Sequence, residues 1–321
     1  MKERKLVILL PQFTQAQRGK IAQTAARLGF TPLFADTAEE ALRLAPDAEV
    51  FFGSAPEFTR AAKALRWVCA PSAGVNQYLA DGALPDPETL LSNSSGAYGV
   101  TISEHIVMVS LEMMRRQQDY SAIVSQRKWV RDLPVTSLKD CRITLVGTGD
   151  IGQEAAVRLR AFSPAALIGV NRGGRNPKNL FDRIVMQTDL AAVLPETDLL
   201  VVSLPGTKDT FRMLDARMIS LLPDGAIVVN VGRGSVIDQR ALFRELSSGR
   251  LKAALDVFEE EPIPQDDPAW ECPNLLITPH VAGNMTLPYT VQRIADLFLS
   301  DLERYARGLL PERLVNREKG Y

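Results

Sequence analysis

The chain has 321 residues, of which 46% are hydrophobic and 23% are charged, as in a globular protein large enough for two domains. Its 37 basic residues nearly balance its 38 acidic ones, so no overall field favours nucleic acid or an anionic membrane as a partner. The three cysteines, Cys69, Cys141 and Cys272, lack the paired spacing of a zinc site or a dithiol, and no metal site is expected.

The N-terminal apolar run, Leu6 to Leu10, is shorter than the hydrophobic region of a signal peptide and stops at Pro11. It therefore predicts a buried β-strand. No other run approaches the ~20 apolar residues of a membrane span, so we expect a cytoplasmic protein that does not associate with membranes.

Short apolar runs alternate with amphipathic segments through the first hundred residues. A helix is expected from Thr14 to Leu28, where Gly29 ends it. Further strands are expected at 32–35, 49–52, 66–70 and 90–92, with helices at 38–44 and 58–65. This repeated strand and helix pattern predicts a parallel sheet.

A long helix is then expected from Ile102 to about Ser125, because apolar residues recur there at helical spacing. A second α/β series follows, with strands expected at 143–146, 167–170, 184–186, 199–203, 226–231, 253–258 and 275–277. A last helix is expected from Tyr289 to Arg307. The fold class predicted from these patterns is α/β, with two parallel sheets.

A glycine-rich turn, Gly147-Thr148-Gly149-Asp150-Ile151-Gly152, follows an apolar strand and opens an amphipathic helix. In that setting the glycines permit a tight turn, close approach of the backbone to a pyrophosphate, and close packing of helix on strand. The N–H groups and dipole at the start of the helix favour phosphate. A glycine pattern alone is often an ordinary turn, but this context predicts a dinucleotide cofactor, NAD or NADP.

The end of the next strand reads Asn171-Arg172-Gly173-Gly174-Arg175, without the carboxylate that binds the ribose 2′-hydroxyl in NAD enzymes. Guanidinium groups suit bidentate binding of phosphate, so Arg172 and Arg175 favour NADP(H), with NAD(H) as the alternative. A solvated basic loop is the other interpretation of this segment.

Three polar residues, Arg233, Glu261 and His280, lie where successive apolar runs end. In an open parallel sheet, ligands bind beyond the carboxyl ends of the strands, so these residues are expected to meet. A cation, a carboxylate and an imidazole together suit acid–base chemistry on an anionic substrate. Glu261 stands in a run of acidic residues, usually a solvated face, but Pro262 fixes the chain after it.

Only two histidines are present, so the candidates for a proton donor are few. His280 precedes small residues that allow a ligand to approach closely, and it is the expected donor. His105 falls early in a long helix, where a structural role is expected.

The turn Ser72-Ala73-Gly74-Val75 follows the strand expected at 66–70. Its backbone N–H groups suit a carboxylate, with Ser72, Gly74 and Val75 as the substrate-binding residues, although an ordinary turn is an equal alternative. Arg233 is expected to bind the same carboxylate, because its planar fork of donors suits a 2-keto acid.

The chain resembles the D-isomer-specific 2-hydroxyacid dehydrogenase family through motifs that occur in the family's order from Ser72 to Gly283. These motifs are Ser72-Ala73-Gly74-Val75-Asn76, Ile102-Ser103-Glu104-His105, the glycine turn, Ser203-Leu204-Pro205-Gly206-Thr207-Lys208-Asp209-Thr210, Asn230-Val231-Gly232-Arg233-Gly234, Leu255-Asp256-Val257-Phe258 through Glu261-Pro262, and Thr278-Pro279-His280. Asn76 and Asn171 depart from the family, which usually has an acid at both positions.

The resemblance implies a flavodoxin-like substrate-binding domain at 1–98, an inserted Rossmann nucleotide-binding domain at 99–285, and a C-terminal helix at 286–321 that returns to the first domain. It also implies a homodimer, with Arg233 orienting the substrate, Glu261 tuning His280, and His280 donating the proton. The implied cofactor-binding residues beyond the glycine turn and the 171–175 segment are Leu204, Pro205, Thr210, Val231, Gly232, Asp256 and Gly283.

The expected activity is therefore interconversion of a small 2-keto acid and its D-2-hydroxy acid, of the glyoxylate or hydroxypyruvate reductase type. Phosphoglycerate dehydrogenases carry an arginine where this chain has Gly53, which disfavours a phosphate-bearing substrate. A phosphoglycerate dehydrogenase-like enzyme is one alternative. A nicotinamide-sensing binding protein of the corepressor type is the other, since such proteins also carry the three polar residues.

Overall fold

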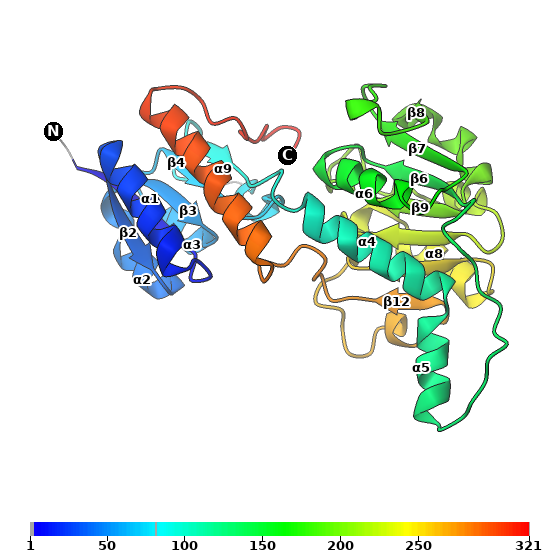
Figure 1. Ribbon diagram of the computed structural model, residues 1–321. Coiled ribbons are helices and arrows are strands. Elements are labelled where there is room, and N and C mark those ends of the chain that lie inside the picture. Colours follow the sequence, from blue (N-terminus) through cyan, green and yellow to red (C-terminus); the bar gives the residue numbers. More distant parts are fainter. Residues whose placement is uncertain (1–2, 81, 321) are drawn as a thin grey trace. The chain divides into compact units, whose positions relative to one another are not determined.

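The computed structural model describes residues 3–80 and 82–320, which form two compact α/β units (Figure 1). The N-terminal unit comprises Met1–Tyr98 together with Met285–Tyr321, and the central unit comprises Gly99–Asn284. Each unit is built on one parallel sheet, so the predicted fold class is confirmed.

The N-terminal unit has a five-stranded sheet in the order β2-β1-β3-β4-β5. Its strands are β1 (Arg4–Leu9), β2 (Phe30–Ala35), β3 (Ala48–Gly53), β4 (Trp67–Cys69) and β5 (Leu90–Ser92). Its helices are α1 (Gln15–Arg27), α2 (Ala38–Arg43), α3 (Pro56–Ala61) and α9 (Pro288–Ala306). Helix α1 begins where the Thr14 side chain accepts from the Gln17 amide while the Gln17 side chain accepts from the Thr14 amide, a reciprocal cap.

Helix α9 belongs to this unit because its apolar face completes the aromatic core. Phe298 stacks on Phe52 with ring centroids 3.9 Å apart, and it also stacks on Trp67. The segment after the helix then pairs with the edge strand β5, through an antiparallel bridge between Leu314 and Ser92. Leu314 thus adds a bridge at the edge of a sheet whose first strand begins at residue 4.

The central unit has a seven-stranded parallel sheet in the order β12-β11-β10-β9-β6-β7-β8. Its strands are β6 (Arg142–Val146), β7 (Ala166–Asn171), β8 (Arg183–Met186), β9 (Leu199–Val202), β10 (Ile227–Asn230), β11 (Lys252–Leu255) and β12 (Leu275–Ile277). Its helices are α4 (Gly99–Met114), α5 (Gln117–Ser125), α6 (Asp150–Arg160), α7 (Ala216–Ser220) and α8 (Gln239–Ser247).

The single helix expected from Ile102 to Ser125 is wrong, because the chain breaks it into α4 and α5. Arg116 adopts a left-handed backbone conformation with φ of 55°, which a continuing helix does not allow. No glycine or proline marks this break, so the apolar spacing gave no sign of it.

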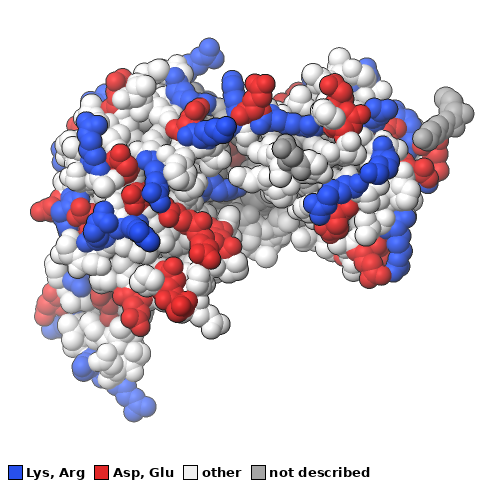
Figure 2. Space-filling model, turned by 180° about the vertical axis from the view of Figure 1, so that it is seen from behind, with Lys and Arg blue, Asp and Glu red and all other residues white. Residues whose placement is uncertain are grey.

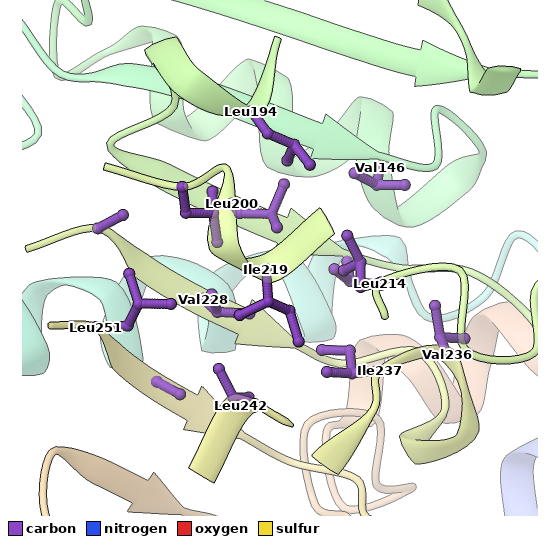
Figure 3. Packing of buried hydrophobic residues seen from close by; sticks show 14 of the residues in the cluster. Val146, Leu194, Leu200, Leu214, Ile219, Val228, Val236, Ile237, Leu242 and Leu251 are labelled. Carbon is purple, nitrogen blue, oxygen red and sulfur yellow. The ribbon is translucent and has the colours of Figure 1, made fainter. Parts of the chain in front are cut away.

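The core of the central unit forms where strands and helices bring apolar side chains to one face of the sheet (Figure 3). Leu200 of β9, Val228 of β10 and Leu242 of α8 all belong to this cluster, and all three are almost fully buried. This packing fixes the strand ends on which the polar residues of the next section stand.

Outside the cores, acidic and basic side chains intermingle across the face seen in Figure 2, in keeping with the balanced charge. Within residues 3–80 and 82–320, no helix has the length and apolar character needed to cross a membrane.

Candidate active site

The sheet order of the central unit brings the three expected catalytic residues to neighbouring strands. Strands β10, β11 and β12 lie side by side and run parallel. Arg233, Glu261 and His280 each follow the carboxyl end of one of them. Parallel strands end at the same edge of a sheet, so the connections that carry the three side chains start together.

Glu261 and His280 form a direct pair. Nδ1 of His280 lies 2.6 Å from Oε2 of Glu261, and the amide of Phe258 donates to Oε1 of the same carboxylate at 2.9 Å. The His280 side chain is 48% exposed and the Glu261 side chain is 35% exposed. A carboxylate on Nδ1 orients the ring and leaves Nε2 for a substrate, the arrangement needed for general acid–base catalysis.

Arg233 is held by glycines that let three backbone segments come close. A Cβ built on Gly232 would lie 2.5 Å from the Leu204 carbonyl oxygen, and one on Gly234 would lie 1.9 Å from the Phe258 carbonyl carbon. Neither position tolerates a side chain. Burial lowers the pKa of the Arg233 guanidinium below its usual range, while the nearby charge of Glu261 opposes that shift.

The buried Asn230 shapes the turn before Arg233. Its side-chain oxygen accepts from the Gly232 amide at 3.0 Å, and its side-chain nitrogen donates to the Arg233 carbonyl at 3.0 Å. An amide is suited to this because it both accepts and donates. The motif placed Asn230 beside the site, but the sequence did not assign it this role.

The carboxylate of Asp256 holds the segment on both sides of His280. It accepts from the Thr278 hydroxyl at 2.6 Å and from the amides of Val281 and Ala282 at 2.9 and 3.0 Å. Its side chain is 2% exposed. Asp256 was expected among the cofactor-binding residues. In the structure its carboxylate is instead hydrogen-bonded to groups of the protein itself.

The glycine turn fits a dinucleotide in its backbone geometry. A Cβ on Gly152 would lie 2.0 Å from the Gly147 carbonyl oxygen, so helix and strand pack here only because residue 152 is glycine. A Cβ on Gly149, at the N-cap of α6, would meet no other atom within 4 Å. The surface before the first turn of the helix is therefore open to a phosphate group. Asp150 and Ile151 open this turn and are half-buried.

Asn171 organises the loop that follows β7. Its side-chain nitrogen donates to the Thr148 hydroxyl at 2.8 Å and to the Arg175 carbonyl at 2.9 Å, and its oxygen accepts from the Gly173 amide at 3.0 Å. A carboxylate at this position would have no hydrogen to donate. Both arginines of the loop are exposed, and Arg172 lies 3.9 Å from Asp209.

The loop after β9 carries three of the remaining expected cofactor residues, Leu204, Pro205 and Thr210. Thr210 accepts from the Thr207 amide and donates to the Pro205 carbonyl at 2.6 Å, which folds the segment from Leu204 onward into a compact turn. Val231 and Gly232 are buried at the end of β10, and Gly283 follows the segment held by Asp256.

The expected substrate turn lies in the N-terminal unit. The Ser72 hydroxyl donates to the Gly74 carbonyl at 2.6 Å, and the buried Asn93 donates to the Ala73 carbonyl at 2.8 Å. Among the described residues, no group accepts from the amide of Gly74 or of Val75. These amides have the hydrogen-bonding capacity that a carboxylate needs. Asn93 is a second supporting residue that the sequence did not reveal.

Comparison with known proteins agrees with this architecture. Residues 107–282 match the model of the family described as D-isomer specific 2-hydroxyacid dehydrogenase, NAD binding domain. The glyoxylate/hydroxypyruvate reductase A of Salmonella paratyphi B is 30% identical over 273 residues, which cover 81% of this chain and 83% of the relative.

Two solved structures share the fold over almost the whole chain. A D-isomer specific 2-hydroxyacid dehydrogenase family protein from Aeromonas salmonicida is 30% identical with a TM-score of 0.86, covering 98% of this chain and 100% of the other. An NADPH-dependent glyoxylate/hydroxypyruvate reductase from Sinorhizobium meliloti, solved with NADP and sulfate, is 27% identical with a TM-score of 0.82, covering 99% and 100%. The chain belongs to the D-isomer specific 2-hydroxyacid dehydrogenase family, and it is an NAD(P)-dependent oxidoreductase that acts on CH–OH groups.

Proposed function

We propose that this dehydrogenase is a reductase of small, unphosphorylated 2-keto acids, of the glyoxylate or hydroxypyruvate type, and that it prefers NADPH. The observation that carries the proposal is the 2.6 Å pair of Glu261 and His280 beside a half-buried arginine at neighbouring strand ends. The names of the Salmonella and Sinorhizobium relatives support the substrate class.

Each residue of the trio has a distinct role in this reaction. Arg233 binds the substrate carboxylate. His280 donates a proton from Nε2 to the carbonyl oxygen, and Glu261 stabilises the charged form of the ring before the transfer. A reduced nicotinamide cofactor held by the glycine turn and the 171–175 loop would supply the hydride for C2. The product is the D-2-hydroxy acid, and one proton is consumed in each turnover.

Gly53 supports a substrate without phosphate. A Cβ at this position would lie 2.7 Å from Cζ of Phe51 and 2.9 Å from Cβ of Leu9. An arginine side chain therefore does not fit there unless the end of β3 moves. The phosphoglycerate dehydrogenase alternative needs a cation at this position, so we place it second.

The 171–175 loop supports NADPH. Asn171 leaves the ribose site without a negative charge, and the loop presents the exposed side chains of Arg172 and Arg175. A 2′-phosphate is held by such guanidinium groups, whereas a 2′-hydroxyl is usually held by a carboxylate. The family resemblance adds a homodimer to the proposal, and sedimentation of the full chain would test this oligomeric state.

A substrate screen tests the proposal. Oxidation of NADPH is followed with glyoxylate, hydroxypyruvate, pyruvate, branched 2-keto acids and 3-phosphohydroxypyruvate. We expect the highest kcat/KM with glyoxylate or hydroxypyruvate. Highest activity on 3-phosphohydroxypyruvate would favour the phosphoglycerate dehydrogenase alternative. No turnover with any of these acids would favour the nicotinamide-sensing binding protein.

The cofactor preference is tested with Arg175→Ala and Asn171→Asp. A hydrogen bond to a charged group contributes about 1.5–3 kcal/mol, so Arg175→Ala should lower kcat/KM for NADPH roughly ten- to a hundredfold and leave the value for NADH nearly unchanged. Asn171→Asp should move the preference further toward NADH. Arg217→Ala, an exposed arginine on α7, is the matched control. A wild-type preference for NADH would contradict this part of the proposal.

A further inference from the structure

The second histidine of the chain, His105, lies against the segment that carries the first. Its side chain on α4 is 10% exposed, and its Nε2 atom lies 3.2 Å from the Thr278 hydroxyl and 3.9 Å from Oδ1 of Asp256. Thr278 stands two residues before His280, while 173 positions of sequence separate it from His105. The proposed roles of the trio leave His105 without a function.

The hydrogen-bond directions at this contact fix the tautomer of His105. The Thr278 hydroxyl has one hydrogen and lies 2.6 Å from Oδ1 of Asp256, a carboxylate that also accepts two backbone amides. That hydrogen therefore goes to Asp256, and the hydroxyl oxygen accepts from His105. Accepting is possible only if Nε2 of His105 carries the ring hydrogen.

Electrostatics agree with a neutral ring at this position. Burial lowers the pKa of His105, while attraction to Asp256 and Glu112 opposes that shift, and the net direction is downward. A neutral imidazole has a single N–H donor, and the contact with Thr278 requires that donor to be Nε2.

His280 needs such support because its backbone is in an unfavourable conformation. Its φ of 53° is left-handed, a conformation that a non-glycine residue keeps only where the surrounding structure imposes it. The His280 amide donates to the carbonyl of Asp256 at 2.9 Å, and the Asp256 carboxylate holds the amides of Val281 and Ala282. Asp256 is therefore the anchor of the segment.

We infer that His105 is a positioning residue for His280, at the start of a chain of hydrogen bonds from His105 Nε2–H to Thr278 and from Thr278 to Asp256. His105 orients the Thr278 hydroxyl, which orients the carboxylate that fixes the backbone around His280. The inference deepens the proposed function and rests on the role of His280 as proton donor. It assigns to α4 a part in the orientation of the imidazole at the end of β12.

Nitrogen-15 NMR of histidine-labelled protein tests the chain of bonds without reference to activity. The full chain, with no added histidine tag, contains only two histidines, and His105→Gln assigns their ring signals by removing one set. At neutral pH we expect His105 as the Nε2–H tautomer, and Thr278→Val should shift its Nε2 signal. The Nδ1–H tautomer at His105, which leaves no hydrogen on Nε2, would overturn the inference.

Matched variants test the positioning role. Glutamine can donate from a nitrogen near the place of Nε2, whereas methionine has a similar size and no donor. We expect His105→Met to lower kcat roughly tenfold with little change in cofactor binding, and His105→Gln to restore most of the turnover. Likewise Thr278→Val should lose turnover that Thr278→Ser keeps. The double variant of His105→Met with Thr278→Val should lose no more turnover than the worse single variant, because both substitutions break the same chain of hydrogen bonds.

Thr144→Val is the control for a purely structural effect. It removes a buried 2.7 Å hydroxyl contact between Thr144 of β6 and Thr197, which precedes β9, away from the carboxyl ends of the strands. It should lower stability and leave turnover per folded molecule unchanged. Equal turnover in the methionine and glutamine variants at His105, or additive losses in the double variant, would refute the inference. If His280→Ala keeps normal turnover, the proposed function fails, while the NMR result still decides whether the chain of bonds exists.

Discussion

The pair of Glu261 with His280 and the pair of Asp301 with Arg313 are built in opposite ways. In the central unit, the first pair is about half exposed and every oxygen of its carboxylate has a partner. In the N-terminal unit, Asp301 is 1% and Arg313 15% exposed, and they meet at 3.0 Å. Oδ2 of Asp301 and Nε of Arg313 are buried with no hydrogen-bond partner among the described residues.

The first pair is suited to a chemical role, whereas the second has a structural one. Burial raises the pKa of the Asp301 carboxyl above its usual value, even though Arg313 and the Glu312 amide favour the charged form. The folded chain therefore holds this charge at a net cost. What the pair provides is a position, because Asp301 on α9 fixes Glu312 and Arg313 just before the segment that extends β5. The exposed pair can exchange a proton with a ligand, which the buried pair cannot.

The largest effect expected at either pair is on turnover in His280→Ala. Positioned proton transfer contributes about 10²- to 10⁴-fold, so kcat should fall by that order. Urea unfolding and cofactor binding should stay close to wild type, because the ring is half exposed. Near-normal kcat would remove His280 from the mechanism.

Glu261→Gln sharpens the contrast within the exposed pair. Glutamine can still accept from the Phe258 amide but carries no charge to stabilise the protonated ring. Loss of a charged hydrogen bond, about 1.5–3 kcal/mol, should slow kcat roughly ten- to a hundredfold. The free energy of unfolding should change by only about 0–1 kcal/mol, as for other exposed pairs. A large loss of stability with unchanged kcat would reverse the assignment.

The smallest effect is expected for Asp301→Asn, and it is a pH-dependent change in the free energy of unfolding. A carboxyl whose pKa is raised by folding contributes stability below its unfolded pKa of about 4, and this contribution is lost as the pH rises through the folded value. The stability of the wild type relative to Asp301→Asn should therefore fall, on the order of 1 kcal/mol, between about pH 4 and neutral pH. Kcat should not change. The account would be contradicted if the stability of the wild type relative to Asp301→Asn increased as the pH rises.

The sequence predicted the parts of the site that follow from strand ends. Apolar runs and glycine turns located Arg233, Glu261 and His280, and parallel topology then makes their strands neighbours. Bonds between residues distant in sequence left no such signal. The contacts of Thr278 with His105 and of Asn171 with Thr148 depend on side chains that only the folded sheet brings together.

Local backbone conformation was the other reason why the structure differs from the sequence-based expectation. Apolar spacing continued through Arg116, but its left-handed conformation separates α4 from α5. The bridge from Leu314 to β5 was also missed, because a single bridging residue in irregular chain carries no periodicity.

A crystal structure of the full chain with NADP⁺ and oxalate, an unreactive analogue of a 2-keto acid, would test the central claim most directly. We predict that a carboxylate of the analogue binds Arg233 and that an oxygen atom lies within hydrogen-bonding distance of His280 Nε2, with Glu261 still on Nδ1. An analogue bound out of reach of His280, or an imidazole that has turned away from Glu261, would contradict the account.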